Sequence, residues 1–287
     1  MLWLGQQSYS APFPRIPESI RAKHSISDLS IRPFGIFEKD LEISFNKERS
    51  RPYLATKILQ CCTLDNYGDP PEKDFFLDLT VGKRNECLLT LATLGGSSLL
   101  NFSTPCLNRA CNQEMEIEIS VDELVTLQHQ YDDSDSFIIR VGDHSMIVRK
   151  PKGYDQLEWL KNSYADEDEA IKEMINTLLS RNEKLVKDRN LLFSEEWVQI
   201  INDSMDEFDP LVNFNFMVYC PYCGNEGRYD VDLEKVSLQR LKDAQIHLIE
   251  SIHHLAKYYH WSEEQFFSIP PWRRSHYLAL IENEKNS

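Results

Sequence analysis

The chain has 287 residues, and 41% of them are hydrophobic, which is enough to bury one large core or two smaller ones. The formal net charge is −15, and this excess of acidic side chains disfavours nucleic acid and anionic membranes as main partners. No run of about 18 apolar residues could span a membrane, and the first residues lack the pattern of a secretion signal. We therefore expect a cytoplasmic protein.

The first third of the chain combines a proline-rich start with two predicted helices. Residues 1–50 hold four prolines among polar residues and only a short alternating stretch, so we expect an N-terminal extension. Apolar residues then recur at helical spacing from Pro52 to Cys62 and from Val81 to Leu94, which predicts two helices. The cysteines within them are interpreted as small buried apolar residues; they are Cys61, Cys62 and Cys87.

A first pair of cysteines follows, between two predicted strands. Residues 100–104 and 114–119 both alternate between apolar and polar side chains, with Cys106 and Cys111 between them. Ser120 is a suitable N-cap for a short helix after the second strand. The pattern therefore predicts a β-hairpin with two cysteines at its tip, leading into a helix.

The middle of the chain holds another hairpin and two more helices. Residues 137–141 and 146–149 are predicted strands on either side of a turn at Gly142 and Asp143. Apolar residues at spacings of three, four and seven predict a helix over 171–186. Ser194 is expected to cap a further helix, which Pro210 ends.

The cysteine pattern of the first hairpin then returns. Residues 212–218 and 229–233 alternate, and Cys220 and Cys223 lie between them, ahead of a long predicted helix. We interpret the two cysteine hairpins as an internal duplication.

The last third of the chain is predicted to be mostly helical. A stripe of apolar residues runs from Leu238 to Tyr259, and a capping box at Ser262 begins a second, short helix. Pro271 begins the last helix, in which two arginines follow a tryptophan. Aromatic residues and arginine are common in interface hot spots, so the candidate partner-binding residues are Trp261, Trp272, Arg273 and Arg274.

The four paired cysteines predict one structural zinc ion. Zinc takes four tetrahedral thiolate or imidazole ligands, and each cysteine turn supplies two sulfurs. The first pair has four intervening residues and the second has two, followed by Gly224, which suits a sharp turn. The proposed ligands are Cys106, Cys111, Cys220 and Cys223. Seven cysteines in all is an odd number, which also favours metal binding over a disulfide framework.

Two alternatives to zinc stay open for these cysteines. Cys-Pro-Tyr-Cys is similar to the redox motif of glutaredoxins, but that chemistry needs the first cysteine at a helix N-terminus, and here a strand is predicted to follow. The other alternative is a set of buried free thiols or an adventitious disulfide.

The sequence gives no sign of catalysis. Phosphate-binding loops, a nucleophile elbow and a zincin-type histidine pair are all missing from it. The histidines near the C-terminus are interpreted as solvated or partner-facing; they are His247, His253, His254 and His260. We therefore expect no catalytic residues.

The C-terminal residues resemble a known family. Residues 248–264, with His-Leu-Ala and Trp-Ser-Glu, and residues 269–278, with Pro-Pro-Trp-Arg-Arg, are similar to the baseplate hub assembly chaperones of T-even-type contractile phages and related injection systems. Residues 78–84 and the Cys-Pro-x-Cys-Gly turn extend the resemblance to roughly residues 50–283. The first cysteine turn is two residues longer here than in that family, and residues 1–50 have no counterpart in it.

The resemblance implies a non-enzymatic chaperone that binds a hub or spike protein during baseplate assembly. The alternatives are a permanent structural subunit of the baseplate and a zinc-ribbon regulator that binds nucleic acid, which the acidic charge disfavours. We expect an α+β fold with two zinc-ribbon-like β-hairpins, surrounding helices and a helical C-terminal segment. The expected divisions are residues 1–50, 51–165 and 166–287.

Overall fold

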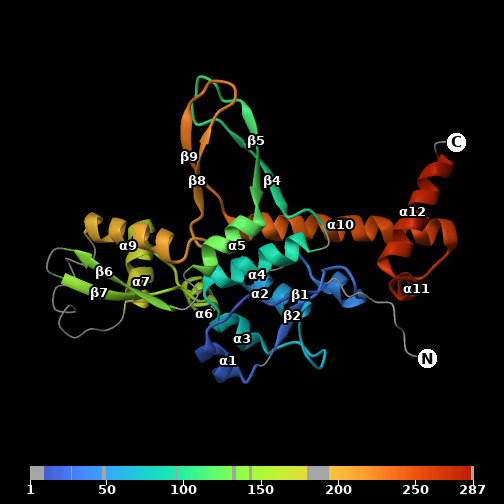
Figure 1. Ribbon diagram of the computed structural model, residues 1–287, viewed down its shortest axis with the longest axis horizontal. Coiled ribbons are helices and arrows are strands. Elements are labelled where there is room, and N and C mark those ends of the chain that lie inside the picture. Colours follow the sequence, from blue (N-terminus) through green and yellow to red (C-terminus); the bar gives the residue numbers. More distant parts are fainter. Residues whose placement is uncertain are drawn as a thin grey trace.

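The structure is a computed structural model of the chain. It describes residues 10–26, 28–46, 50–94, 96–130, 134–141, 144–179 and 194–285. These residues form helices and four small antiparallel sheets, which confirms the predicted α+β class. Figure 1 shows a central helical body, a lobe at each end of the long axis, and a pair of hairpins that project from one side.

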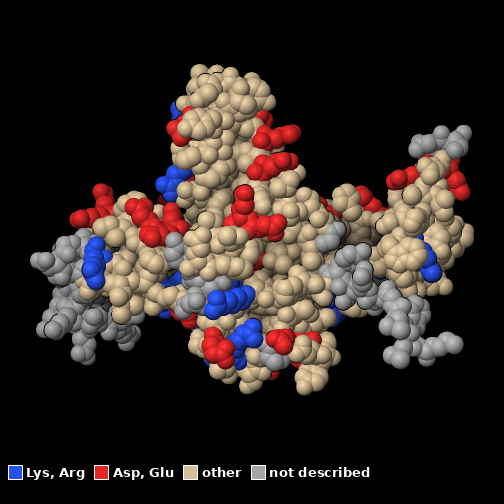
Figure 2. Space-filling model, viewed as in Figure 1, with Lys and Arg blue, Asp and Glu red and all other residues tan. Residues whose placement is uncertain are grey.

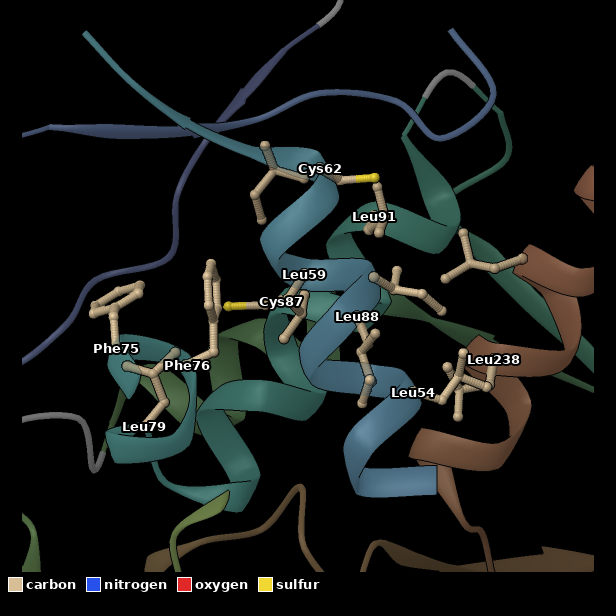
Figure 3. Packing of buried hydrophobic residues seen from close by; sticks show 14 of the residues in the cluster. Leu54, Leu59, Cys62, Phe75, Phe76, Leu79, Cys87, Leu88, Leu91 and Leu238 are labelled. Atoms are coloured by element: carbon tan, nitrogen blue, oxygen red, sulfur yellow. The ribbon is translucent and has the colours of Figure 1, made fainter. Parts of the chain in front are cut away.

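The central body is built from helices that pack on one another through apolar side chains. The elements that contribute are α2 (Arg51–Cys62), α3 (Lys73–Asp78), α4 (Val81–Thr93) and the first half of α10 (Leu233–Tyr259). Figure 3 shows how their buried residues meet, among them Leu59, Phe76, Leu88 and Leu238. Both predicted helices of this region are therefore confirmed.

The cysteines of these helices differ in their surroundings. Cys62 and Cys87 are fully buried in the central core, which confirms their interpretation as small apolar residues. Cys61 is half-buried and packs only at the border of that core.

The N-terminal segment is part of the central body. Its elements are β1 (Ala11–Pro12), α1 (Glu18–His24), β2 (Leu29–Ile31) and the 3-10 helix η1 (Glu38–Glu42). β2 pairs with β1 and with β3 (Thr63–Asp65), which directly follows α2, so the segment is joined to the core by a three-stranded sheet. Ile16, Ile20, Ile31 and Ile43 are buried in the central core.

The expectation that residues 1–50 project as an extension is therefore wrong for their described part. The four buried isoleucines follow no periodic pattern in the sequence, because prolines interrupt the segment and its strands have only two or three residues. Whether the chain divides into domains at residues 50 and 165 stays a prediction.

A buried arginine joins three helices of the body. Arg84 in α4 is fully buried, and its guanidinium donates to the carbonyl oxygens of Pro52 at 2.8 Å and Phe76 at 2.9 Å and to the Thr56 hydroxyl at 3.0 Å. Burial lowers the pKa of Arg84 to about 10, so it remains charged at neutral pH. This side chain ties α2 and α3 to α4.

The first turn of α4 also lies against the end of α9 (Glu195–Phe208). Asp209, the C-cap of α9, is fully buried and accepts a hydrogen bond from Gln128 Nε2 at 2.9 Å. Burial raises the pKa of Asp209 to about 6. Its carboxylate reaches this position because Gly82 has no side chain there.

Two smaller lobes flank the body. In one, the hairpin of β6 (Ser136–Val141) and β7 (His144–Arg149) packs on α9 and on α7 (Glu167–Leu178). Trp197 is buried between them. Along the chain, α6 (Gly153–Trp159) connects this hairpin to α7. The turn at Gly142 and Asp143 and the predicted helical residues 180–186 lie outside the described residues.

The other lobe contains the end of α10 with α11 (Glu263–Ser268) and α12 (Pro271–Lys285), as predicted. A capping box joins Ser262 and Gln265 at the start of α11.

Alanine at Gly82 should destabilise the chain strongly. Its methyl group would lie 1.8 Å from Asp209 Oδ1 and 2.7 Å from Cγ, so the buried carboxylate would have to leave Gln128. We expect a loss of roughly 2 kcal/mol or more in the free energy of unfolding, measured by urea denaturation. Gly96→Ala is the control, because its methyl group would lie 3.6 Å from the nearest atom, Arg240 Nη2. Equal stability of the two variants would contradict the close approach.

Candidate metal centre

Both predicted cysteine hairpins are present. β4 (Leu99–Pro105) pairs with β5 (Glu114–Ser120), and β8 (Asn215–Tyr219) pairs with β9 (Glu226–Asp230), each pair antiparallel. Each hairpin leads into a helix, the first into α5 (Val121–His129) and the second into α10. The two hairpins rise side by side from the body in Figure 1, and we call residues 99–120 and 215–230 together the tower.

Alternation of side chains explains how the two hairpins pack. Met115 and Ile117 on β5 and Tyr229 on β9 are buried, whereas the glutamates that alternate with the two β5 residues are exposed. The rings of Phe102 and Phe216 meet edge to face with centroids 6.3 Å apart, so the apolar faces of the hairpins lie against each other.

An arginine side chain joins each hairpin to the helices. Arg240 of α10 donates to the carbonyl oxygens of Leu99 at 2.7 Å and Ser97 at 2.9 Å. Arg228 of β9 forms an ion pair of 3.1 Å with Asp206 of α9. Both hairpins of the tower are thus bound to the helices, the first at its base and the second partway along β9.

The first cysteine turn absorbs its two additional residues in a tight hydrogen-bonded loop. The carbonyl oxygen of Asn108 accepts from the backbone N–H groups of Cys111 and Asn112, both at 2.9 Å. Asn112 follows the second cysteine and has a φ of 47°, a left-handed conformation that asparagine tolerates. The side-chain amide of Asn108 also reaches across to Cys223 Sγ at 3.9 Å.

The second turn has the same construction. The carbonyl oxygen of Cys220 accepts from the backbone N–H of Gly224 at 2.9 Å, and Gly224 has a φ of 70°. A left-handed residue therefore follows the second cysteine of each turn, which is the role expected for Gly224.

The four cysteines meet at the tip of the tower. Their sulfurs all lie within 4.8 Å of one another, with 3.7 Å between Cys106 and Cys223 and 3.9 Å between Cys111 and Cys220. Each of these two contacts joins one hairpin to the other. Four sulfurs around a tetrahedral zinc ion, each about 2.3 Å from it, would be about 3.8 Å apart. The arrangement is compatible with a bound metal ion, and all four cysteines are free thiols rather than disulfides.

Backbone amides favour the thiolate form of Cys220. Burial acts to raise the pKa of Cys220, but the N–H groups of Tyr222 and Cys223 point at its sulfur and lower the pKa to about 7. Burial raises the pKa of Cys106 to about 12, against the opposing N–H of Asn108. Thiols of this kind bind a cation by losing their protons, so metal affinity should fall as the pH falls.

The surroundings of Cys220 differ from those of a redox-active cysteine. β9 and not a helix follows the Cys220 turn, so no helix N-terminus lies there to stabilise a catalytic thiolate.

A second group of possible ligands is better explained as an ion pair. Asp40, Cys61 and Cys62 also bring their ligand atoms within 4.8 Å of one another. However, both carboxylate oxygens of Asp40 accept from Arg32, at 2.6 and 2.8 Å, and the backbone N–H of Gly35 adds a further bond at 2.9 Å. A cation here would have to displace the guanidinium, so these residues do not fit a metal site.

The candidate partner-binding residues fall into two groups. Trp272 and Arg273 are exposed on the first turn of α12, where a partner could reach them. Trp261 is half-buried and stacks on Tyr259, with ring centroids 4.8 Å apart, and also contacts Tyr277.

Arg274 lies inside the C-terminal lobe and not on its surface. Its guanidinium stacks over Phe266 at 4.3 Å, and its Nε donates to the carbonyl oxygen of Ile269 at 2.7 Å. The structure therefore gives Arg274 a packing role, and the expectation that it binds a partner needs correction. Two arginines in sequence look alike, but on a helix they point about 100° apart.

Sequence reasoning missed the side chains that align the two cysteine turns. The backbone N–H of Leu107 in the first turn donates to the Tyr229 hydroxyl of the second hairpin at 3.0 Å. A side chain at Gly227 would lie 3.0 Å from Leu107 Cδ1, so the missing side chain leaves room for this leucine. The alternation places Tyr229 on an inner face, but only the structure identifies the group that its hydroxyl meets.

Replacing Arg274 should destabilise the C-terminal lobe, whereas replacing Arg273 should not. Arg274→Ala removes the stacking on Phe266 and leaves the Ile269 carbonyl without its donor, which should cost about 1–3 kcal/mol of unfolding free energy. Arg273→Ala, on the exposed side of the same helix, should change stability by less than about 0.5 kcal/mol. Thermal unfolding followed by tryptophan fluorescence measures both, and equal effects would contradict the assigned roles.

Comparisons with known proteins identify no family for this chain: no protein-family model, no curated protein and no solved structure matches it. Within the described ranges, every helix is too short or too polar to cross a membrane. The function must therefore be inferred from the thiol cluster, the exposed surfaces and the sequence resemblance.

Proposed function

We propose that the chain is a non-enzymatic assembly factor for the hub or spike of a contractile-tail baseplate, with one structural zinc ion joining its two hairpins. The observation that supports the zinc ion is the meeting of four thiols from two hairpins at nearly tetrahedral separations. A set of four cysteines without an open coordination position is typical of a structural zinc site. The hairpins would then be a pair of zinc-ribbon-like units.

The zinc ion would stabilise contacts that are weak without it. A two-stranded hairpin is marginally stable in water at best, and the tower consists of two of them. Their shared buried cluster near the tip is small: Cys106, Met115, Cys220 and Tyr229. Metal–thiolate bonds between the hairpins would supply the stabilisation that so small a core cannot.

The assembly role is supported by the sequence resemblance and by the surface of the molecule. Of the segments that resemble the chaperone family, residues 78–84 surround the buried start of α4, and residues 248–264 and 269–278 lie in the C-terminal lobe. The exposed Trp272 is suited to binding another protein, and the excess of acidic residues favours a basic partner.

Metal analysis tests the zinc ion. Protein produced with ample zinc should contain about one zinc per chain, and Cys220→Ser should lose it together with part of its stability. Cys61→Ser, a cysteine outside the cluster, should keep the zinc and serves as the control. Stoichiometric zinc in the Cys220→Ser variant, or none in the wild type, would reject the site.

Quantitative mass spectrometry of purified tails tests the assembly role. An assembly factor should be absent or substoichiometric in finished particles, and deletion of its gene should reduce the number of complete baseplates. A constant stoichiometric amount in mature particles would instead identify a permanent structural subunit.

A further inference from the structure

The tip of the tower and the adjoining outer face of β8 expose large apolar and aromatic side chains. Leu107, Met217, Tyr219 and Tyr222 are 56%, 55%, 68% and 64% exposed. All four belong to the cysteine turns or to the strand β8 that leads into the second turn. Single exposed apolar residues are common on protein surfaces, but a group of them at one projecting end is typical of a contact surface.

Strand geometry explains why two of these residues point outward. Met217 and Tyr219 alternate on β8 with Phe216 and Val218, which face the other hairpin. Their cross-strand partners are Arg228 and Glu226, both exposed. The alternation of side chains along β8 therefore turns Met217 and Tyr219 outward while it turns Phe216 and Val218 toward the core of the tower. Met217 and Tyr219 are not needed for that core.

One flank of the tower is uniformly acidic. Glu114, Glu116 and Glu118 share the outer face of β5 and are all exposed. The residues opposite them on β4 are Pro105, Ser103 and Asn101, so no cross-strand cation offsets their charge. None of the ion pairs among the described residues involves these glutamates. Figure 2 shows acidic side chains along this flank and a mostly uncharged tip.

We propose that the tower tip is the docking surface for a protein partner whose own surface has an apolar centre bordered by lysine or arginine. This inference deepens the proposed function and rests on it. The tip would supply the apolar contact, and the Glu114–Glu118 flank would steer and orient a basic border.

Charge argues against the other occupants of this surface. A nucleic acid or an anionic membrane would meet three unpaired carboxylates beside the tip. A second copy of the chain would bring an identical acidic flank to the contact, where like charges repel. The first cysteine turn also exposes one cation, Arg109, which the three glutamates of the flank outnumber. A protein surface with an apolar centre and a basic border therefore suits the apolar side chains and the flank together.

The tower is also arranged in advance of binding. The contacts between Cys106 and Cys223 and between Leu107 and Tyr229 hold the two turns together, and Arg240 holds the base. A partner would therefore not have to order this surface, which lowers the entropic cost of binding.

The test measures the binding of the full chain to each purified hub and spike protein of the same tail, one at a time. The double variant Tyr219→Ser, Tyr222→Ser should weaken binding about tenfold or more, as removal of interface anchors does. Changing Glu114, Glu116 and Glu118 together to lysine should weaken binding most at low salt, because high salt screens the electrostatic interaction between this flank and the partner. Metal content and unfolding midpoint equal to the wild type show that each variant is folded.

Two further variants separate the possible outcomes. Tyr67→Ser, at a site 90% exposed and outside the tower, should bind within about twofold of the wild type. If the tower variants bind as the wild type does while Trp272→Ser loses binding, the docking surface is on α12 and this inference fails, although the assembly role stands. If the wild type binds none of the tail proteins, the proposed function fails first. Self-association that the tip variant abolishes would assign the tip to a second copy and overturn the inference.

Discussion

The contact between four thiols at the far end of two hairpins is the constraint on which the tower depends. Each hairpin has only two strands, and its outer face is solvated, so neither can bury enough apolar surface alone. The sulfurs of Cys106 and Cys223 come together from positions 117 residues apart, and the chain between them includes α5, α6 and the lobe of β6, β7, α7 and α9. Closing this contact therefore joins the two halves of the chain into one framework.

The local elements were predictable because their side-chain periods are strong. Alternation in residues 114–119 and 212–218 indicated strands, and helical spacing indicated α2, α4 and α10. The grouping of the four cysteines followed from ligand chemistry rather than from period. The equivalent position of the two hairpins, each ahead of a helix, supported that grouping before any distance was known.

Other features were not predictable from patterns along the chain. β1 and β2 have two and three residues, too few to show an alternation, so the burial of Ile31 had no local signal. Arg274 looks like a surface arginine until Phe266 and the Ile269 carbonyl are placed beside it. The burial of Ile31 depends on elements that are distant in the sequence, so a short window does not reveal it. The contacts of Arg274 cross from α12 to α11 and to the residue that ends α11, so the period of one helix does not predict them.

The uninterrupted length of α10 gives the molecule a fixed internal distance. Its 27 residues contain neither glycine nor proline. The helix begins shortly after β9 and ends at Tyr259, because the next residue, His260, has a left-handed conformation. At 1.5 Å per residue this is a rod of about 40 Å with one end at the base of the tower and the other in the C-terminal lobe. Because one continuous helix joins the two ends, the base of the tower and the lobe that carries Trp272 are held at a set distance from each other.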